Sequence, residues 1–256
     1  MSEEIRSGVY AGSFYPKSEK ELSKMIKGFL VKAKSQKKLK GKLRALIVPH
    51  AGYIYSGSVA ANAYSFLEKE KSKNIILFGP THHAYFEGIF SFSGYWITPL
   101  GKIKVTSADL PILKNDNEHS LEVQLPFLQT VLENFSFTPI IYGEIQPEEL
   151  ADIINSEMKK ESVLIASSDL SHYLSYELAK KIDKETINAV LELNLEKFID
   201  VGDACGKIGI SALIILAKKN KWKAHLLMYK NSGDTAGDKK GVVGYAAIAF
   251  LDEKEL

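Results

Sequence analysis

Cysteine is nearly absent from this chain, since Cys205 is the one cysteine among 256 residues. No intrachain disulfide can form, so a disulfide scaffold and a metal site made of cysteines alone are excluded. Arginine is almost as scarce, because only Arg6 and Arg44 occur among 33 basic residues, and the formal net charge is only +2. Phosphate and nucleic-acid sites depend on arginine and on excess positive charge, so we expect no nucleic-acid partner.

Long apolar runs are also missing from the sequence. No run reaches the roughly 18 residues needed to cross a bilayer, and residues 1–10 lack the apolar core of a signal peptide. We therefore expect no membrane association and a cytoplasmic location. No repeat or low-complexity segment divides the chain, so residues 1–256 are predicted to form a single domain.

The sequence does contain short apolar strands that alternate with amphipathic helices. Strands are predicted at residues 44–49, 74–79, 89–97, 101–105, 137–142, 163–167, 225–229 and 242–251. Helices are predicted at residues 18–33, 56–69, 121–135, 147–160 and 206–219, and residues 176–201 are predicted to form one or two helices. Continuous apolar strands are typical of a sheet covered on both faces, and the closely spaced last two strands indicate antiparallel pairing. The predicted fold is α/β, a three-layer αβα sandwich with a central mixed sheet.

Polar residues gather directly after three of the predicted strands. The strand-end sequences are PHAGY at 49–53, GPTHH at 79–83 and SSDLSH at 167–172. Four of the six histidines follow these ends: His50, His82, His83 and His172. Ligands of open α/β sheets bind beyond the carboxyl ends of the strands, so these side chains converge if the three strands are parallel neighbours. For each histidine taken alone, the alternative to a role in a ligand site is an ordinary structural role.

Cys205 precedes the apolar helix predicted at 206–219, and a helix N-terminus favours the thiolate that binds metals. The alternative to metal binding is that Cys205 is an inert buried thiol. Two imidazoles and a thiolate form a three-ligand set with open positions, which suits Fe²⁺, copper or Zn²⁺ and argues against Mg²⁺ or Ca²⁺. No HExxH, CxxC, Walker A or GxSxG pattern occurs, which removes the common motif-based alternatives.

Other polar residues are candidates for the same crevice. His119 and Glu122 stand at i, i+3 and suit acid–base work or the orientation of a ligand, with helix capping as the alternative. Asp169 is predicted to orient a histidine, with a simple turn as the alternative. Tyr53 is a candidate for lining the pocket, with aromatic packing as the alternative.

At these residues the chain resembles the Memo family. The matching segments are AGSFY (11–15), PHAGYIYSG (49–57), GPTHH (79–83), DNEHSLEVQLPFL (116–128), SSDLSHY (167–173) and CGKIGI (205–210). They occur in family order and cover nearly the whole chain. In archaea and bacteria such proteins are also called protein B of the AmmeMemoRadiSam system, which implies a radical enzyme as partner. One departure is Phe14, where animal relatives have tryptophan in a proposed peptide-binding surface, so a phosphotyrosine-peptide role is not carried over.

The resemblance implies a fold similar to class III extradiol dioxygenases, which use non-haem Fe²⁺. In Memo proteins a cysteine replaces the glutamate of the dioxygenase ligand set. Carried over to this sequence, the metal ligands are His50, His82 and Cys205, and His172 takes the place of the acid–base histidine. The full set of expected site residues adds Asp169 and His119 as catalytic groups and His83, Glu122 and Tyr53 as groups around the cofactor.

Two functions follow as hypotheses. The first is a redox enzyme that depends on Fe²⁺ or copper and acts on an unidentified small molecule. The second is a non-catalytic module on a dioxygenase-like fold that binds a peptide or protein. A third, weaker reading is hydrolysis assisted by zinc.

Overall fold

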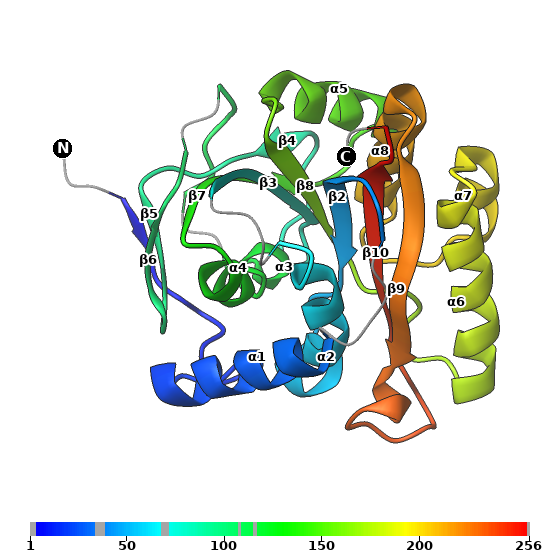
Figure 1. Ribbon diagram of the computed structural model, residues 1–256, viewed down its shortest axis with the longest axis horizontal. Helices are drawn as coiled ribbons and strands as arrows, with labels where there is room; N and C mark the ends of the chain where they lie inside the picture. Colours follow the sequence, from blue (N-terminus) through cyan, green and yellow to red (C-terminus); the bar gives the residue numbers. More distant parts are fainter. Residues whose placement is uncertain (1–3, 34–38, 68–71, 107–108, 115–116, 255–256) are drawn as a thin grey trace.

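The structure is a computed structural model that describes residues 4–33, 39–67, 72–106, 109–114 and 117–254 (Figure 1). Its centre is a seven-stranded mixed sheet. In spatial order the strands are β4 (Ile89–Phe90), β7 (Asn134–Tyr142), β3 (Ser72–Pro80), β8 (Ser162–Ser167), β2 (Lys42–Val48), β10 (Gly244–Asp252) and β9 (Lys223–Asn231). The predicted antiparallel pairing of the last two strands is confirmed.

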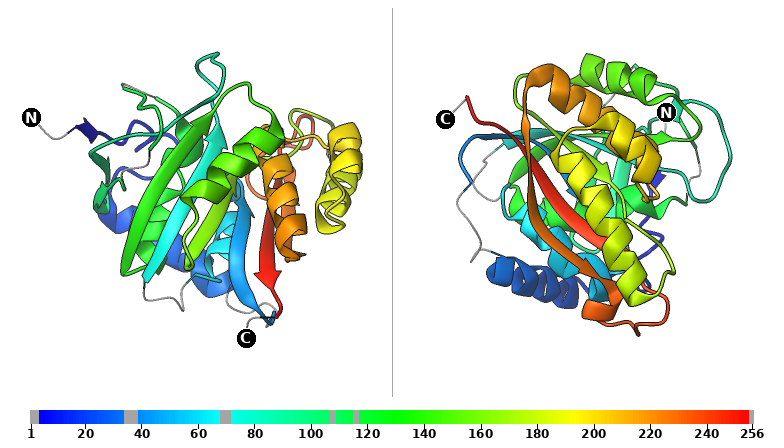
Figure 2. Two further views of the ribbon diagram at one scale, coloured as in Figure 1. Left: turned by 90° about the horizontal axis from the view of Figure 1, so that it is seen from above. Right: turned by 90° about the vertical axis from the view of Figure 1, so that its right-hand side faces the viewer.

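Helices cover both faces of this sheet (Figures 1 and 2). One face is covered by α1 (Glu19–Ala33), α2 (Tyr53–Tyr64), α3 (His119–Glu122) and α4 (Leu125–Val131). The other face is covered by α5 (Pro147–Glu157), α6 (Tyr176–Leu191), α7 (Leu195–Val201) and α8 (Lys207–Asn220), and a 3₁₀ turn η1 (Ser232–Asp234) precedes β10. The predicted three-layer αβα sandwich is confirmed.

The strands have apolar residues on both faces because each face meets its own core. In β2, Leu46 and Val48 pack into the core beneath α1–α4, while Ala45 and Ile47 pack into the core beneath α5–α8. Such a strand has no polar face, which is why its sequence is a continuous apolar run rather than an alternation.

Strands β3, β8 and β2 are neighbours and run parallel, with β8 in the middle. This arrangement meets the condition under which the three strand-end sequences converge. The carboxyl ends of the strands therefore open onto one edge of the sheet, where the loops that follow them lie close together.

One predicted strand was wrong. Residues 89–97 do not form one strand: Ile89 and Phe90 pair with β7 in the large sheet, whereas β5 (Tyr95–Thr98) belongs to a second sheet with β1 (Ile5–Arg6) and β6 (Gly101–Lys104). Gly94 separates the two, with φ +76° and a backbone so close to Glu4 that a side chain has no room. Strands β5 and β6 pair as an antiparallel hairpin, with Thr98 opposite Gly101.

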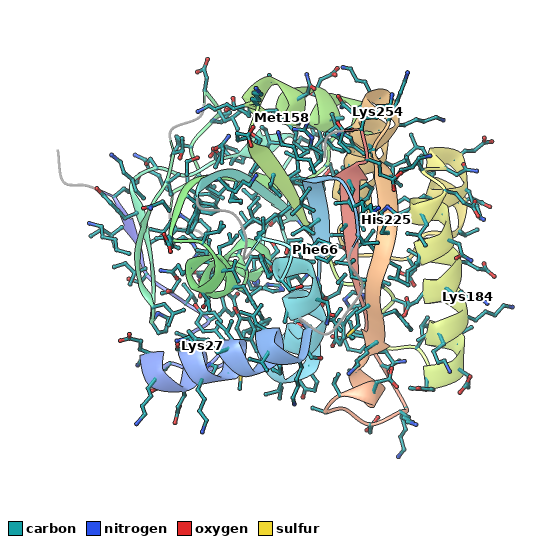
Figure 3. All side chains as sticks on the ribbon, in the orientation of Figure 1. Lys27, Phe66, Met158, Lys184, His225 and Lys254 are labelled. Atoms are coloured by element: carbon teal, nitrogen blue, oxygen red, sulfur yellow. The ribbon has the colours of Figure 1, made fainter. Side chains whose placement is uncertain are left out.

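Figure 3 shows Lys27 and Lys184 extending outward from α1 and α6. His225 lies on β9, where its Nε2 is 3.1 Å from a carboxylate oxygen of Glu253, in keeping with a structural role. Within the described residues, no helix has both the length and the apolar character that crossing a membrane demands.

Candidate functional site

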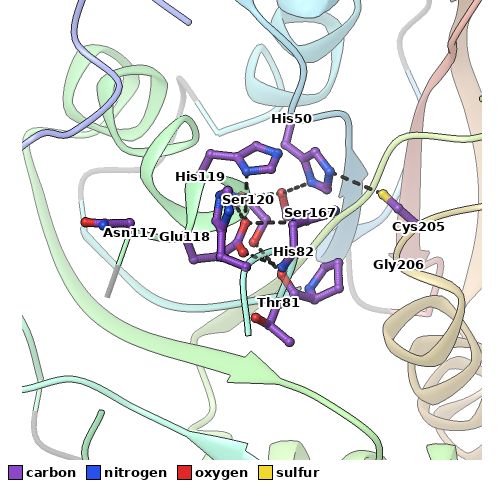
Figure 4. Close-up of polar contacts among 12 residues, drawn as sticks. His50, Thr81, His82, Asn117, Glu118, His119, Ser120, Ser167, Cys205 and Gly206 are labelled. Carbon is purple, nitrogen blue, oxygen red and sulfur yellow. Dashed lines mark hydrogen bonds and ion pairs between the residues drawn. The ribbon is translucent and has the colours of Figure 1, made fainter. Parts of the chain in front are cut away.

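The site lies where β2, β3 and β8 end. His50 follows β2 by two residues and His82 follows β3 by two residues, and their ring centroids are 5.1 Å apart. His119, the first residue of α3, joins them at 5.2 Å from the His50 ring and 4.5 Å from the His82 ring. Figure 4 shows these residues together with Cys205, which reaches His50 from the loop before α8.

His50 is held with one ring nitrogen free to bind a metal. The hydroxyl of Ser167 donates to the carbonyl of Ser120 at 2.5 Å, so its oxygen can only accept from His50 Nδ1 at 3.1 Å. The Nδ1 atom of His50 therefore carries the proton, and Nε2 presents its lone pair. Burial, reinforced by the nearby His82 and His119, holds the pKa of His50 well below its usual value, which keeps the ring neutral.

Glu118 orients the other two imidazoles. This carboxylate is fully buried and accepts from His82 Nδ1 at 2.9 Å, while His119 Nδ1 lies 3.1 Å from the same oxygen. Burial alone would raise the pKa of Glu118, but the contacts with His119 and His82 lower it well below its usual value. Because an ionised carboxylate only accepts, both histidines carry their proton on Nδ1 and leave Nε2 free.

The three histidines satisfy the distance requirement for a shared ion. One ring nitrogen each from His50, His82 and His119 lie within 4.8 Å of one another. Cys205 is not a member of this close group, but its Sγ lies 3.2 Å from His50 Nε2. The structure thus brings the sequence-predicted ligands His50 and Cys205 into direct contact and adds His119 to the cluster.

Cys205 is a partly buried thiol. The backbone N–H of Asp169 donates to its Sγ at 3.3 Å, and Ser168 Oγ lies 3.7 Å away. Burial, with a smaller contribution from the charge of Asp169, raises the pKa of Cys205 to about 12. Burial therefore opposes the stabilisation of the thiolate that is expected at a helix N-terminus. A bound cation reverses this balance by stabilising the thiolate.

Asp169 and His172 come from the loop that follows β8. Asp169 accepts from the backbone N–H of His50 at 2.8 Å, so it positions the backbone of this histidine rather than its ring. Burial raises the pKa of Asp169 to about 7. His172 is half-buried, and burial lowers its pKa, which favours the neutral ring. It lies outside the three-histidine group.

His83 and Tyr53 lie outside the three-histidine group, although ligand atoms of His83, Glu118 and His119 form a second group within 4.8 Å of one another. His83 is exposed and contacts the hydroxyl of Tyr10 through Nε2 at 2.8 Å, with its ring 5.9 Å from that of His119. The hydroxyl of Tyr53 donates to the carbonyl of Val123 at 2.6 Å, in the core under α2.

Glu122 supports the N-terminal segment instead of the crevice. Its carboxylate binds Arg6 Nη1 at 2.6 Å and the hydroxyl of Tyr15 at 2.7 Å. It also accepts from the backbone N–H groups of Val9 and Tyr10. These contacts occupy both oxygens, so Glu122 holds residues 6–15 against α3.

A cavity of about 430 Å³ opens beside the cluster. Its walls include His82 and Cys205, together with Tyr85, Tyr142 and Glu144. Two of the sequence-predicted metal ligands therefore border a space large enough for a small molecule.

Sequence reasoning missed Glu118 and Ser167 as the acceptors that set the tautomers. The available signal was chemical: a metal-binding imidazole needs an acceptor for its second ring nitrogen. Glu118 stands next to His119 in the sequence and Ser167 ends β8, so both were adjacent to predicted site residues.

Comparison with known proteins agrees with this picture. The Memo-like protein family matches residues 6–249. The chain belongs to this family. A MEMO1 family protein of Methanosarcina mazei is 38% identical, with the match covering 96% of this chain and 98% of the relative. MEMO1 family proteins of Thermoplasma acidophilum and Saccharolobus solfataricus are 34% and 38% identical over 96% and 94% of this Memo family chain, and over 98% and 97% of their own lengths.

Proposed function

We propose that this Memo family protein is a redox enzyme that depends on a non-haem Fe²⁺ or copper ion and acts on a small molecule. His50, His82 and Cys205 would hold the ion, and Zn²⁺ is the alternative metal. The observation that carries the proposal is the set of tautomers: buried acceptors fix the Nδ1 proton of His50 and His82, so both Nε2 lone pairs are available.

The donor set fits a late first-row transition metal. Neutral imidazole nitrogens and a cysteine sulfur suit iron, copper and zinc, whereas Mg²⁺ and Ca²⁺ prefer oxygen ligands. The 3.2 Å separation of Cys205 Sγ and His50 Nε2 is close to that expected for two ligands of one ion, given bond lengths of about 2.0–2.3 Å.

The residues around the ligands would perform the remaining steps. When bound, the ion would supply redox chemistry and positions for O₂ or substrate. His172 follows β8, and burial lowers its pKa, which favours the neutral ring that could accept a proton from a bound substrate. Asp169 fixes the backbone of His50, and Tyr85 and Tyr142 form walls of the cavity that would receive the substrate.

The finer family relationships belong to the same proposal. We propose that the sandwich is similar to that of class III extradiol dioxygenases and that the protein acts in the cytoplasm. We also propose that it corresponds to protein B of the AmmeMemoRadiSam system and works with a radical enzyme. The parallel strand ends that bring His50 and His82 together support the first of these statements.

The direct test is oxygen uptake after metal restoration. Purified protein is stripped of metal, reloaded anaerobically with Fe²⁺ or copper, and assayed with catechols and other reductants. We expect metal-dependent turnover that disappears in His50→Ala and Cys205→Ala and persists in His225→Asn, which removes a histidine on β9. Absence of turnover with either metal would contradict the redox proposal, and element analysis that finds zinc alone would favour hydrolysis.

A second candidate function is supported by exposed aromatic rings. Tyr85 and Tyr173 are 81% and 80% exposed and follow site histidines by two residues or fewer. Such rings favour docking of a peptide or protein beside the site. Capture of a partner from the native source by the wild type and equally by His50→Ala would favour this binding module.

A further inference from the structure

We propose that His119 is an additional metal ligand, so that the ion is held by three imidazole nitrogens and one sulfur. The inference rests on the proposed metal site and extends its donor set. Its first support is distance, because ring nitrogens of His50, His82 and His119 lie within 4.8 Å of one another. Nitrogens bound to one ion lie roughly 3–4 Å apart at the usual bond lengths, so a small side-chain adjustment brings the three nitrogens to binding distance. Cys205 lies outside this group and would join the ion from its position 3.2 Å from His50 Nε2.

The second support is that His82 and His119 share one acceptor. Glu118 Oε1 is 2.9 Å from His82 Nδ1 and 3.1 Å from His119 Nδ1. A carboxylate that accepts from the remote nitrogen is the usual partner of a metal-binding histidine, because it fixes the tautomer and the ring orientation. Glu118 provides this arrangement twice, once for a predicted ligand and once for His119.

The third support is that the ring of His119 is confined. Its centroid is 5.0 Å from that of Phe14 and 5.5 Å from that of Tyr10. A ring packed in this way loses little further freedom when it binds an ion. The backbone also limits it, because Glu118 caps α3 by accepting from the N–H of Ser120 at 2.8 Å.

The inference has a consequence for the choice of metal. Four protein donors fill the tetrahedral positions that Zn²⁺ prefers and give a closed, structural type of site. An ion that accepts more than four ligands, such as Fe²⁺, would keep positions for O₂ or substrate. A donor set of three nitrogens and one sulfur therefore favours iron over zinc for the proposed redox reaction.

The test counts metal-bound imidazoles in the whole protein loaded with Zn²⁺ alone. Nitrogen NMR of the six histidines distinguishes a metal-bound ring nitrogen from a protonated or a bare one. We expect three metal-bound signals, from His50, His82 and His119. In His119→Asn, where the amide can still donate to Glu118, we expect two signals and a Zn²⁺ affinity lower by more than about 100-fold, beyond the usual loss for an outer partner.

The controls separate this inference from the proposed function. His225→Asn should leave the three metal-bound signals and the affinity unchanged. Two signals in the wild type, from His50 and His82 only, would overturn the role of His119 and leave the metal site standing. No metal-bound signal in the wild type would overturn both. Should His119→Asn not fold, the number of signals in the wild type decides the question.

Discussion

Glu118 is the residue on which two imidazoles depend, and its charge is testable by itself. In Glu118→Gln the side chain keeps a single acceptor oxygen. Its NH₂ group faces a ring N–H, from which it cannot accept a hydrogen bond. We expect metal affinity to fall about 10–100-fold, measured by competition with a chelator. The matched control is Glu149→Gln on the exposed face of α5. Unchanged affinity in Glu118→Gln would contradict the orienting role.

Asp169 predicts a pH dependence of stability in the metal-free protein. Burial raises its pKa from 3.8 to about 7 although the N–H groups of His50 and Ala51 act in the opposite direction. The folded state therefore holds this proton more tightly than the unfolded state. The stabilisation from Asp169 is complete below the unfolded pKa of 3.8 and is lost as the pH rises through about 7.

The measurement is urea unfolding of the chelator-treated protein between about pH 4 and pH 8. Relative to Asp169→Asn, which does not titrate, the wild type should lose unfolding free energy as the pH rises. Parallel pH profiles for the two proteins would show that Asp169 keeps an ordinary pKa. A wild type that gains stability over this range, relative to the variant, would reverse the sign of the argument.

At the residue scale, sequence reasoning located the histidines better than their partners. His50 and His82 could be expected at the site because strand ends are recognisable from apolar runs. The tautomers could not be predicted, because the acceptors Glu118 and Ser167 reach the rings only after folding. Glu122 was expected at the crevice, but the N-terminal segment covers it and occupies its carboxylate.

At the scale of elements, the start of α8 determines where Cys205 lies. Gly206 approaches β8 so closely that a Cβ atom there would stand 2.6 Å from Ser168 Cβ and 3.1 Å from the carbonyl oxygen of Ser167. In Gly206→Ala, the loop and the beginning of α8 must move away from the strand. We expect Cys205 Sγ to separate from His50, with loss of metal affinity comparable to that in Cys205→Ala, measured by chelator competition.

Gly28→Ala on α1 is the matched control, because a Cβ atom at Gly28 meets nothing within 4 Å. That variant should bind metal like the wild type and gain up to about 1 kcal/mol of unfolding free energy from higher helix propensity. Wild-type affinity in Gly206→Ala would show that the close approach of α8 does not position the sulfur.

Strand prediction succeeded for the strands that are buried on both faces and failed in part for the small sheet. The parallel strands are buried on both faces, so their apolar runs indicate them directly. The small sheet of β1, β5 and β6 was missed in part because β1 spans only two residues, Ile5–Arg6, which have too little pattern to be recognised. The break before β5 depends on Gly94, whose positive φ cannot be inferred from hydropathy.

At the scale of the whole molecule, metal binding should stabilise the fold. A ligand that binds only the folded state at about 100 times its Kd contributes about 2.7 kcal/mol, which raises Tm by roughly 5–10 °C for a chain of this size. We expect this increase when Zn²⁺ is added to the stripped protein, measured by calorimetry. Cys205→Ala and His50→Ala should lose most of the increase, and His225→Asn should keep it.

The sequence supported the three-layer architecture as a whole, because helix and strand periods alternate along the chain. A single unit spanning residues 1–256 stays a prediction. The two cores lie on opposite faces of one sheet and share strands such as β2.

The contact between Cys205 and His50 joins residues 155 positions apart in the chain. During synthesis, β2, β3 and β8 can emerge and pair before the sulfur donor has left the ribosome. The ion would therefore have no complete binding site until about four-fifths of the protein has been made. If the proposed ion binds there, the sulfur donor would join the site only after the parallel strands have assembled.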